Sequence, residues 1–252
     1  MNVVFIPNID LKNGRSNPYH YSVKSWKHWC DKNDVKLIEW TDPIMDPSKV
    51  KITLQRWWVH DILEYNNIDY DQVLMVDADT IVHPNCPNFF NETNNKFSAV
   101  LNNGCYEWTN RSIKEWNKLF PNESIIPTWK YINGGFIIGN KSTKHMYDTI
   151  KDFYLKNIDS INTLTKEIKA GTDQTIINYL IQQNAFDVNQ LPECYNVQDL
   201  FRKNLLHIPN HSWFIDELHF LNNGWVYHFN AIPPNDRNFG YWMERTYNYL
   251  YK

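Results

Sequence analysis

The sequence has few cysteines, no long apolar run and no signal-peptide pattern, and each absence excludes a class of protein. The four cysteines, Cys30, Cys86, Cys105 and Cys194, are widely spaced and form no Cys-x-x-Cys pair, so we expect reduced thiols rather than a zinc ribbon or a thioredoxin-like motif. No stretch approaches the roughly 18 apolar residues of a membrane span. The first residues lack a basic start and a long apolar stretch. We therefore expect a cytoplasmic protein without a transmembrane segment.

Positive charge is not in excess either. The formal net charge is -3, whereas proteins that bind nucleic acids without sequence preference need lysine and arginine clustered against phosphates. A nucleic-acid partner is therefore not expected. Aromatic residues are abundant, at 15% of the chain. Such residues can stack on sugars or bases, but for most of them we expect the usual role of filling a core.

The order of apolar segments predicts an α/β fold. The 252 residues suit one domain. A strand at Val3 to Ile6, a helix over 19–33 and a strand at Val35 to Trp40 make a β-α-β opening. The later segments predict helices over 50–65, 110–120, 143–157, 173–184 and 238–251, and strands over 73–82, 97–101, 131–138 (broken by Gly134-Gly135) and 226–229.

Two aspartates interrupt the apolar segment from Val73 to Val82. Asp77 and Asp79 are separated by one residue, so both carboxylates can converge on one hard cation, and oxygen ligands suit Mn²⁺ or Mg²⁺ better than zinc. Asp-x-Asp occurs often by chance, and the acids could instead serve a turn or a cap. Acids beside a strongly apolar strand are costly unless they are neutralised, and this context favours a metal site at the carboxyl end of a buried strand.

Four further segments, taken with this one, resemble GT-A glycosyltransferases, in particular the retaining enzymes of family 8, such as glycogenin and the bacterial lipopolysaccharide galactosyltransferases. In chain order they are Arg56 within Leu54-Gln55-Arg56-Trp57-Trp58, then Asn133-Gly134-Gly135-Phe136-Ile137-Ile138, then Thr172-Asp173-Gln174-Thr175-Ile176-Ile177-Asn178, and finally His228-Phe229. The resemblance spans roughly residues 3 to 237, and the order of the motifs is more persuasive than any single one.

The resemblance implies a GT-A fold, which is a Rossmann-like, mixed and mostly parallel sheet flanked by helices. It implies one domain over 1–252, with a nucleotide-binding half at 1–105 and an acceptor-binding half with the C-terminal tail at 106–252. The implied activity is that of a metal-dependent hexosyltransferase that moves a sugar from a nucleotide-sugar, expected to be a UDP-sugar, to a hydroxyl of a glycan, lipid or protein with retention.

The resemblance also assigns residues. Asp77, Asp79 and His228 would hold Mn²⁺ or Mg²⁺, and Asp173 and Gln174 would be catalytic. Substrate-binding residues would be Ile6, Pro7, Asn8, Arg56, Asn133, Gly134, Gly135 and Arg237. One feature departs from the family, which typically has a glycine three residues and a diphosphate-binding lysine six residues after the histidine. Here Ala231 and Pro234 occupy those positions, and Arg237 is the nearest candidate to replace the lysine.

Other interpretations of these motifs remain open at this stage. His228 could be a core histidine, Asn133-Gly134 a type I′ turn, and Asp173 an acid of a first helical turn capped by Thr172. A haloacid-dehalogenase-like phosphatase also ends a strand in Asp-x-Asp, but its motif continues to a threonine where this chain has Ile81. A catalytically silent carbohydrate-binding protein on the same scaffold is the third possibility, because a fold does not fix a function.

Overall fold

The computed structural model of the chain describes residues 1–206 and 218–252. Its centre is a six-stranded sheet in the order β2-β1-β3-β6-β5-β7, in which every strand except β6 runs in the same direction. A second sheet pairs β4 with β8 in antiparallel fashion. The strands are β1 Val3–Pro7, β2 Lys36–Trp40, β3 Gln72–Val76, β4 Thr80–Val82, β5 Phe97–Leu101, β6 Ile132–Asn140, β7 Val188–Leu191 and β8 Val226–His228.

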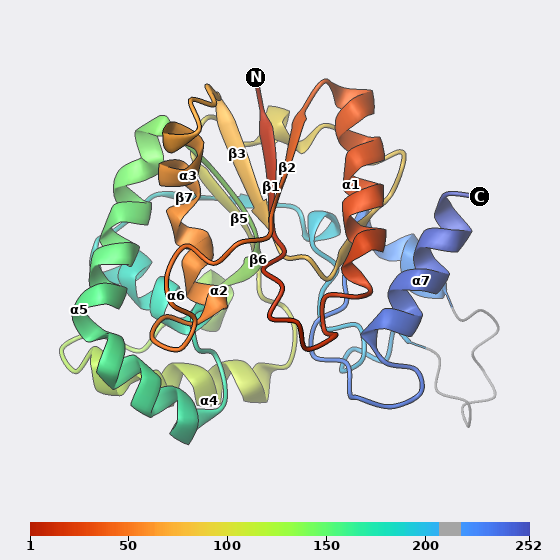
Figure 1. Ribbon diagram of the computed structural model, residues 1–252. Helices are drawn as coiled ribbons and strands as arrows, with labels where there is room; N and C mark the ends of the chain where they lie inside the picture. Colours follow the sequence, from red (N-terminus) through yellow and green to blue (C-terminus); the bar gives the residue numbers. More distant parts are fainter. Residues whose placement is uncertain (207–217) are drawn as a thin grey trace.

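Helices cover both faces of the main sheet, with α1 and α7 on the right in Figure 1 and α2 to α6 on the left. The expected α/β class, with a mixed and mostly parallel sheet between helices, is confirmed. The helices are α1 Tyr19–Asn33, α2 Ile52–Gln55, α3 Val59–Tyr65, α4 Tyr106–Trp116, α5 Lys144–Ile168, α6 Gln174–Gln183 and α7 Phe239–Leu250, and a 3-10 turn, η1, covers Arg56–Trp58.

Alternating side chains of the strands divide the core between the two faces of the sheet. Val3 and Phe5 pack in one apolar cluster with residues of α3 to α6, whereas Val4 and Ile6 pack in another with Trp26 and Trp29 of α1. A strand that is covered on both faces must be apolar at every position, and this accounts for the near-continuous apolar runs of β1 and β3. Five tryptophans are fully buried, as expected for core-filling aromatics: Trp26, Trp29, Trp57, Trp116 and Trp242.

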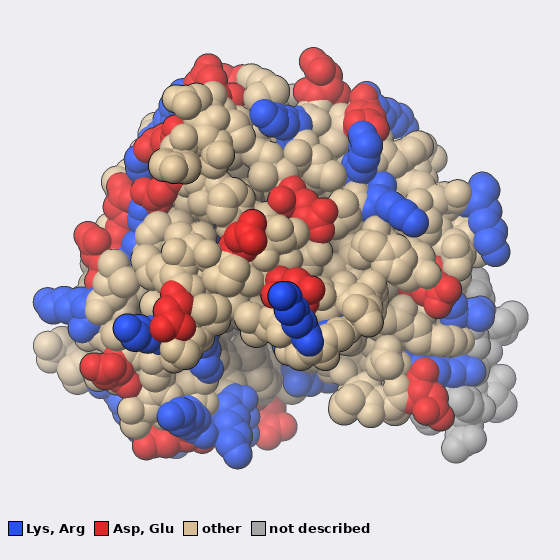
Figure 2. Space-filling view, in the orientation of Figure 1, with Lys and Arg blue, Asp and Glu red and all other residues tan. Residues whose placement is uncertain are grey.

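The distribution of surface charge and the state of the cysteines match what the composition predicts. Figure 2 shows acidic and basic side chains interspersed over the face of the molecule seen there, without a continuous basic surface. All four cysteines are free thiols. Within residues 1–206 and 218–252, no helix combines the length and the apolar character that crossing a membrane requires.

Five predicted elements were wrong in their extent. The helix predicted over 50–65 is divided into α2, η1 and α3, and the helix predicted over 110–120 is α4, Tyr106–Trp116. The segment 73–82 is not one strand, because the chain leaves the main sheet after Val76 and enters the small sheet at Thr80. Gly134-Gly135 neither break a strand nor form a type I′ turn, and β6 continues through both. The helix predicted to end at residue 157 runs to Ile168 across a kink at Asn157, where φ is -115° and ψ is 15°. Apolar residues at helical spacing continue beyond the kink and pack on the core, namely Ile158, Ile161, Leu164 and Ile168.

One buried histidine of this fold has a consequence for stability. His60 of α3 lies against Tyr147, with ring centroids 4.2 Å apart, and hydrogen-bonds through Nδ1 to the Tyr70 hydroxyl. Burial, helped by the positive charge of Lys144, lowers the pKa of His60 from 6.5 to about 4. Folded His60 is therefore neutral between these two values, whereas the unfolded chain binds a proton there.

We expect His60 to lower the free energy of unfolding as the pH falls from about 6.5 towards 4, by up to about 1.4 kcal/mol per pH unit. Urea unfolding of the wild type and of His60→Gln over this range measures the effect. The gap between the two proteins should narrow as the pH falls, because only the wild type takes up this extra proton on unfolding. Parallel pH curves would contradict the prediction, and exposed His145→Gln controls for the loss of a histidine.

Candidate active site

Asp77, Ala78 and Asp79 form the crossing between the two sheets. The Asp77 backbone nitrogen donates to the Gly135 carbonyl of β6 at 3.0 Å, and the Asp79 carbonyl accepts from the Phe229 nitrogen, just after β8, at 2.8 Å. In the small sheet, His228 is the register partner of Thr80. The crossing therefore brings together two acids from the first third of the chain and a histidine from its C-terminal part.

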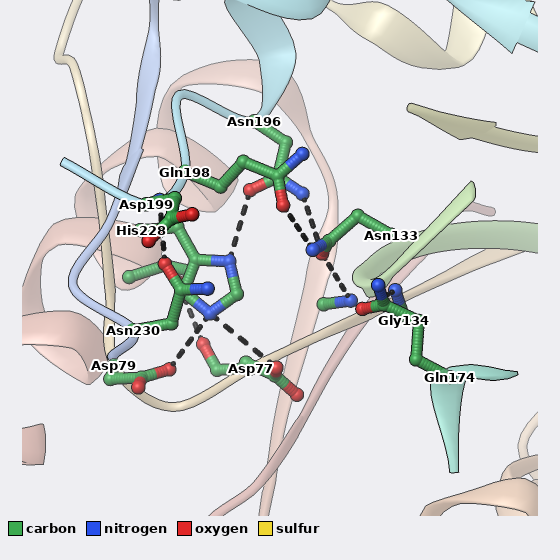
Figure 3. Close-up of polar contacts among 12 residues, drawn as sticks. Asp77, Asp79, Asn133, Gly134, Gln174, Asn196, Gln198, Asp199, His228 and Asn230 are labelled. Carbon is green, nitrogen blue, oxygen red and sulfur yellow. Dashed lines mark hydrogen bonds and ion pairs between the residues drawn. The ribbon is translucent and has the colours of Figure 1, made fainter. Parts of the chain in front are cut away.

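The three side chains converge closely enough to bind one ion (Figure 3). His228 Nε2 lies 3.2 Å from Asp79 Oδ1 and 3.5 Å from Asp77 Oδ2. One potential ligand atom from each residue lies within 4.8 Å of the other two. Two carboxylate oxygens and one imidazole nitrogen form a donor set that fits Mn²⁺, with Mg²⁺ as the harder alternative.

The same proximity shifts the pKa of each group. Burial raises the pKa of Asp77 and outweighs the opposing charges of Arg56 and His228. Burial acts in the same sense on Asp79, but the charge and hydrogen bond of His228 hold the pKa of Asp79 below its ordinary value. Burial alone would lower the pKa of His228, yet Asp79 and Asp77 raise it. The site thus favours positive charge facing the two carboxylates.

A buried arginine joins Asp77 to the start of α6. Arg56 of η1 is 6% exposed, and it donates through Nη1 to Asp77 and through Nη2 to Asp173. Asp173, rather than Thr172, is the N-cap residue of α6, although its side chain makes no capping bond. Removing one partner from a buried ion pair typically costs several kcal/mol, so this arrangement holds both carboxylates in place.

Two glycines of β6 make room for these side chains. A Cβ on Gly134 would lie 2.7 Å from Arg56 Nη2, and a Cβ on Gly135 would lie 2.4 Å from His228 Cε1 and 2.8 Å from Asp77 Oδ2. Contacts this short do not occur for real Cβ atoms. Gly134 also donates its N–H to Gln174 Oε1 at 3.1 Å. Both glycines therefore permit the close approach of the strand to the site.

A cavity of about 530 Å³ opens beside these residues, within the range usual for small-molecule sites. Three of the residues predicted from the sequence do not line it. Ile6 is completely buried in the core, Asn8 donates its side-chain amide to Glu39 at 2.6 Å, and the Arg237 guanidinium lies 5.6 Å from the centre of the Tyr241 ring. The others do line it: Pro7, Arg56, Asp77, Asp79, Asn133, Gly134, Gly135, Asp173, Gln174 and His228.

The cavity also contains residues that the motifs did not indicate. Arg15 and Tyr19 line it from the loop after β1 and from α1, and Arg15 Nε donates to the Tyr19 hydroxyl at 3.3 Å. Tyr19, and then the charges of Asp79 and Asp77, raise the pKa of Arg15, so the guanidinium interacts electrostatically with these two acids. Trp108 and Lys169 line it as well. The polar composition of residues 9–17 gave no signal for this role.

Comparisons with known proteins identify the fold. By sequence, neither a protein-family model nor a curated protein matches the chain. By structure, it is similar to a glycosyltransferase involved in the glycosylation of the major capsid of PBCV-1, with a TM-score of 0.62 and 10% identity over 97% of this chain and 98% of that one. It is also similar to the glycosyltransferase GlyE of Streptococcus pneumoniae TIGR4, with a TM-score of 0.53 and 16% identity over 100% of this chain, which spans 61% of GlyE. The chain therefore has the GT-A type of fold.

Gly135→Ala should disturb the cluster of Asp77, Asp79 and His228 directly, because the added methyl group would displace His228 and Asp77. If this cluster holds a cation, the displacement should weaken its binding. We expect at least about tenfold weaker Mn²⁺ binding by calorimetry, with about 1–3 kcal/mol lower stability. Gly139→Ala is the matched control on the same strand, since its Cβ would lie 2.5 Å from the Tyr147 hydroxyl instead. The control should lose stability and keep its Mn²⁺ affinity, and equal affinities of the two variants would contradict the prediction.

Proposed function

We propose that the chain is a divalent-metal-dependent glycosyltransferase that transfers a sugar from a nucleoside-diphosphate donor, a UDP-sugar, to a hydroxyl of a glycan, lipid or protein. The observation that carries the proposal is the convergence of Asp77, Asp79 and His228 on the wall of the 530 Å³ cavity. The acids follow a central strand of a mostly parallel sheet, which is the edge where such sheets bind ligands. The GT-A fold supports the same class of reaction.

Asp77, Asp79 and His228 would hold a cation such as Mn²⁺. When bound, the cation supplies Lewis-acid stabilisation of the negative charge on the leaving diphosphate. The chain's own groups do the positioning, because Arg56 keeps Asp77 aimed at the site and ties it to Asp173. Gly134 and Gly135 also line the cavity, so a sugar bound there would contact the backbone of β6.

Gln174 and Asp173 would orient the reacting sugars. Gln174 Nε2 is buried beside the Tyr131 hydroxyl, which is itself bonded to Thr175, and Gln174 Oε1 accepts the Gly134 N–H at 3.1 Å. Gln174 also lines the cavity, so its fixed side chain would lie beside a sugar bound there. The Asp173 carboxylate is already paired with Arg56. This pairing suits orienting a hydroxyl better than removing its proton, and it favours transfer with retention over inversion.

The alternative functions predict different experimental results. The GT-A fold removes the reason for considering a haloacid-dehalogenase-like phosphatase. A silent carbohydrate-binding protein would bind sugars or sugar nucleotides without breaking the bond between sugar and diphosphate. Mn²⁺-stimulated release of nucleoside diphosphate from a panel of sugar nucleotides separates this possibility from an enzyme, since slow donor hydrolysis needs no knowledge of the acceptor.

Asp79→Asn keeps the size of the side chain and removes its charge. If the cation supplies several kcal/mol to the reaction, turnover of the preferred sugar nucleotide should fall at least about 100-fold. Asp31→Asn, in an exposed ion pair with Lys27, is the charge-matched control and should keep wild-type turnover. Near-wild-type turnover of Asp79→Asn would rule out this metal site.

The charge balance of the site indicates how the donor's diphosphate is held. Asp77, Asp79 and Asp173 carry three negative charges, and Arg56 with a divalent cation balances them. A bound diphosphate adds negative charge that needs a further cation. Arg15 lines the cavity, and the charges of Asp79 and Asp77 raise its pKa. Arg237 lies against the Tyr241 ring and does not line the cavity. We therefore assign to Arg15 the role that a lysine after the histidine has in the family.

Arg15→Gln should weaken the binding of UDP in the presence of Mn²⁺ by about 10- to 100-fold, the value of one charge-assisted hydrogen bond, and leave the binding of uridine unchanged. Isothermal titration with the two ligands measures both constants. Arg237→Gln is the matched control and should change neither. The opposite pattern, with UDP affinity lost only in Arg237→Gln, would contradict the prediction and assign the diphosphate contact to Arg237.

A further inference from the structure

A series of buried amides lies behind His228, on the side away from the acids (Figure 3). Asn196, Asn133 and Gln198 are 1%, 2% and 0% exposed. The segment that contains Asn196 and Gln198 runs beside β8, where Val197 accepts a hydrogen bond from the His228 nitrogen at 2.9 Å. Asn133 comes from β6. One strand, β6, and one extended segment thus bring three amide side chains to the back of the imidazole of β8.

Two backbone groups fix the direction of every hydrogen bond in this series. The Leu101 carbonyl can only accept, and it accepts from Gln198 Nε2 at 2.9 Å. The Gly135 N–H can only donate, and it donates to Asn133 Oδ1 at 2.8 Å. Gln198 therefore presents Oε1 to Asn133 Nδ2, and Asn133 presents Oδ1 to Asn196 Nδ2 at 2.9 Å. An amide reversed at any point would set donor against donor or acceptor against acceptor.

The direction of the series determines which ring nitrogen of His228 carries a proton. With Asn196 Nδ2 donating to Asn133, Asn196 Oδ1 is the atom that faces His228 Nδ1, at 3.1 Å. Nδ1 must then be the donor, so in the neutral ring the lone pair is on Nε2. That nitrogen faces Asp77 and Asp79. A histidine that ligates a metal usually donates its other N–H to a carboxylate, a backbone carbonyl or water, and an amide carbonyl is an acceptor of the same kind.

We propose that Asn196 is a positioning residue that holds neutral His228 in the Nδ1–H tautomer, and that Asn133 and Gln198 fix the orientation of Asn196. The part that concerns metal affinity rests on the proposed function, and the tautomer does not. If Asn196 only filled space, the nearby carboxylates would draw the proton to Nε2, because Asp79 Oδ1 is 3.2 Å away. The two interpretations therefore predict opposite tautomers.

The tautomer can be measured in the metal-free wild type. Long-range ¹H–¹⁵N correlation spectra in mildly alkaline solution distinguish the two neutral forms, and His228→Gln identifies the signals of His228 among the nine histidines. We expect the Nδ1–H form. An Nε2–H form would overturn the proposal, and this experiment needs no variant of Asn196 that could fail to fold.

The second part of the proposal, that Asn196 supports metal binding, is tested by measuring Mn²⁺ affinity. Asn196→Leu removes the acceptor and should weaken Mn²⁺ binding, followed by electron paramagnetic resonance, by about 10- to 100-fold. Asn196→Asp keeps an acceptor for Nδ1 but sets its second carboxylate oxygen against Asn133 Oδ1, so it should lose clearly less Mn²⁺ affinity than Asn196→Leu. Unchanged affinity in Asn196→Leu, or equal loss in both variants, would overturn the proposal.

The control is Asn140→Leu, which removes another buried amide at the far end of β6, where Asn140 bonds to Asn95 and Thr143. It should lower the melting temperature and leave Mn²⁺ affinity unchanged. A wild type that binds no Mn²⁺ would refute the metal site of the proposed function, while the tautomer would still decide the role of Asn196.

Discussion

The gathering of three carboxylates around very few positive charges is the constraint on which this structure depends. Asp77, Asp79 and Asp173 would repel one another in a buried setting unless cations separated them. Arg56 meets this demand for two of them and His228 faces the third. The end of β3, the start of α6, the turn η1 and the end of β8 all meet at this point because their charged residues compensate one another.

Much of the fold could be predicted because its signals are local. The apolar runs of β1 and β5 and the helical spacing over 19–33 match the observed elements closely, since a strand or a helix is largely determined by the periodicity of its own residues. The acids and His228 could be connected only through their resemblance to a known order of motifs. Their spatial convergence depends on the register of β4 with β8, which no local pattern contains.

The parts that were missed have a common physical cause. Gly134 and Gly135 looked like a break because glycine is intrinsically poor in strands, but their purpose depends on Arg56 and His228, which come from elsewhere in the sequence. Asn196 and Gln198 lie in a segment with little periodicity and act through partners on β6 and β8. Arg15 lies in an irregular loop. In each case the proposed role depends on tertiary contacts, which cannot be inferred from the local sequence.

The pairing of β4 with β8 gives the site a second effect. It joins the first third of the chain to its C-terminal part, so the ligand cluster can assemble only after a very long loop has closed. A cation bound by Asp77, Asp79 and His228 would then link distant segments of the chain. It would stabilise the folded state, because a ligand that binds only this state favours it by mass action. The proposed cation would thus couple the protein's resistance to local opening and proteolysis to the ion supply of its surroundings.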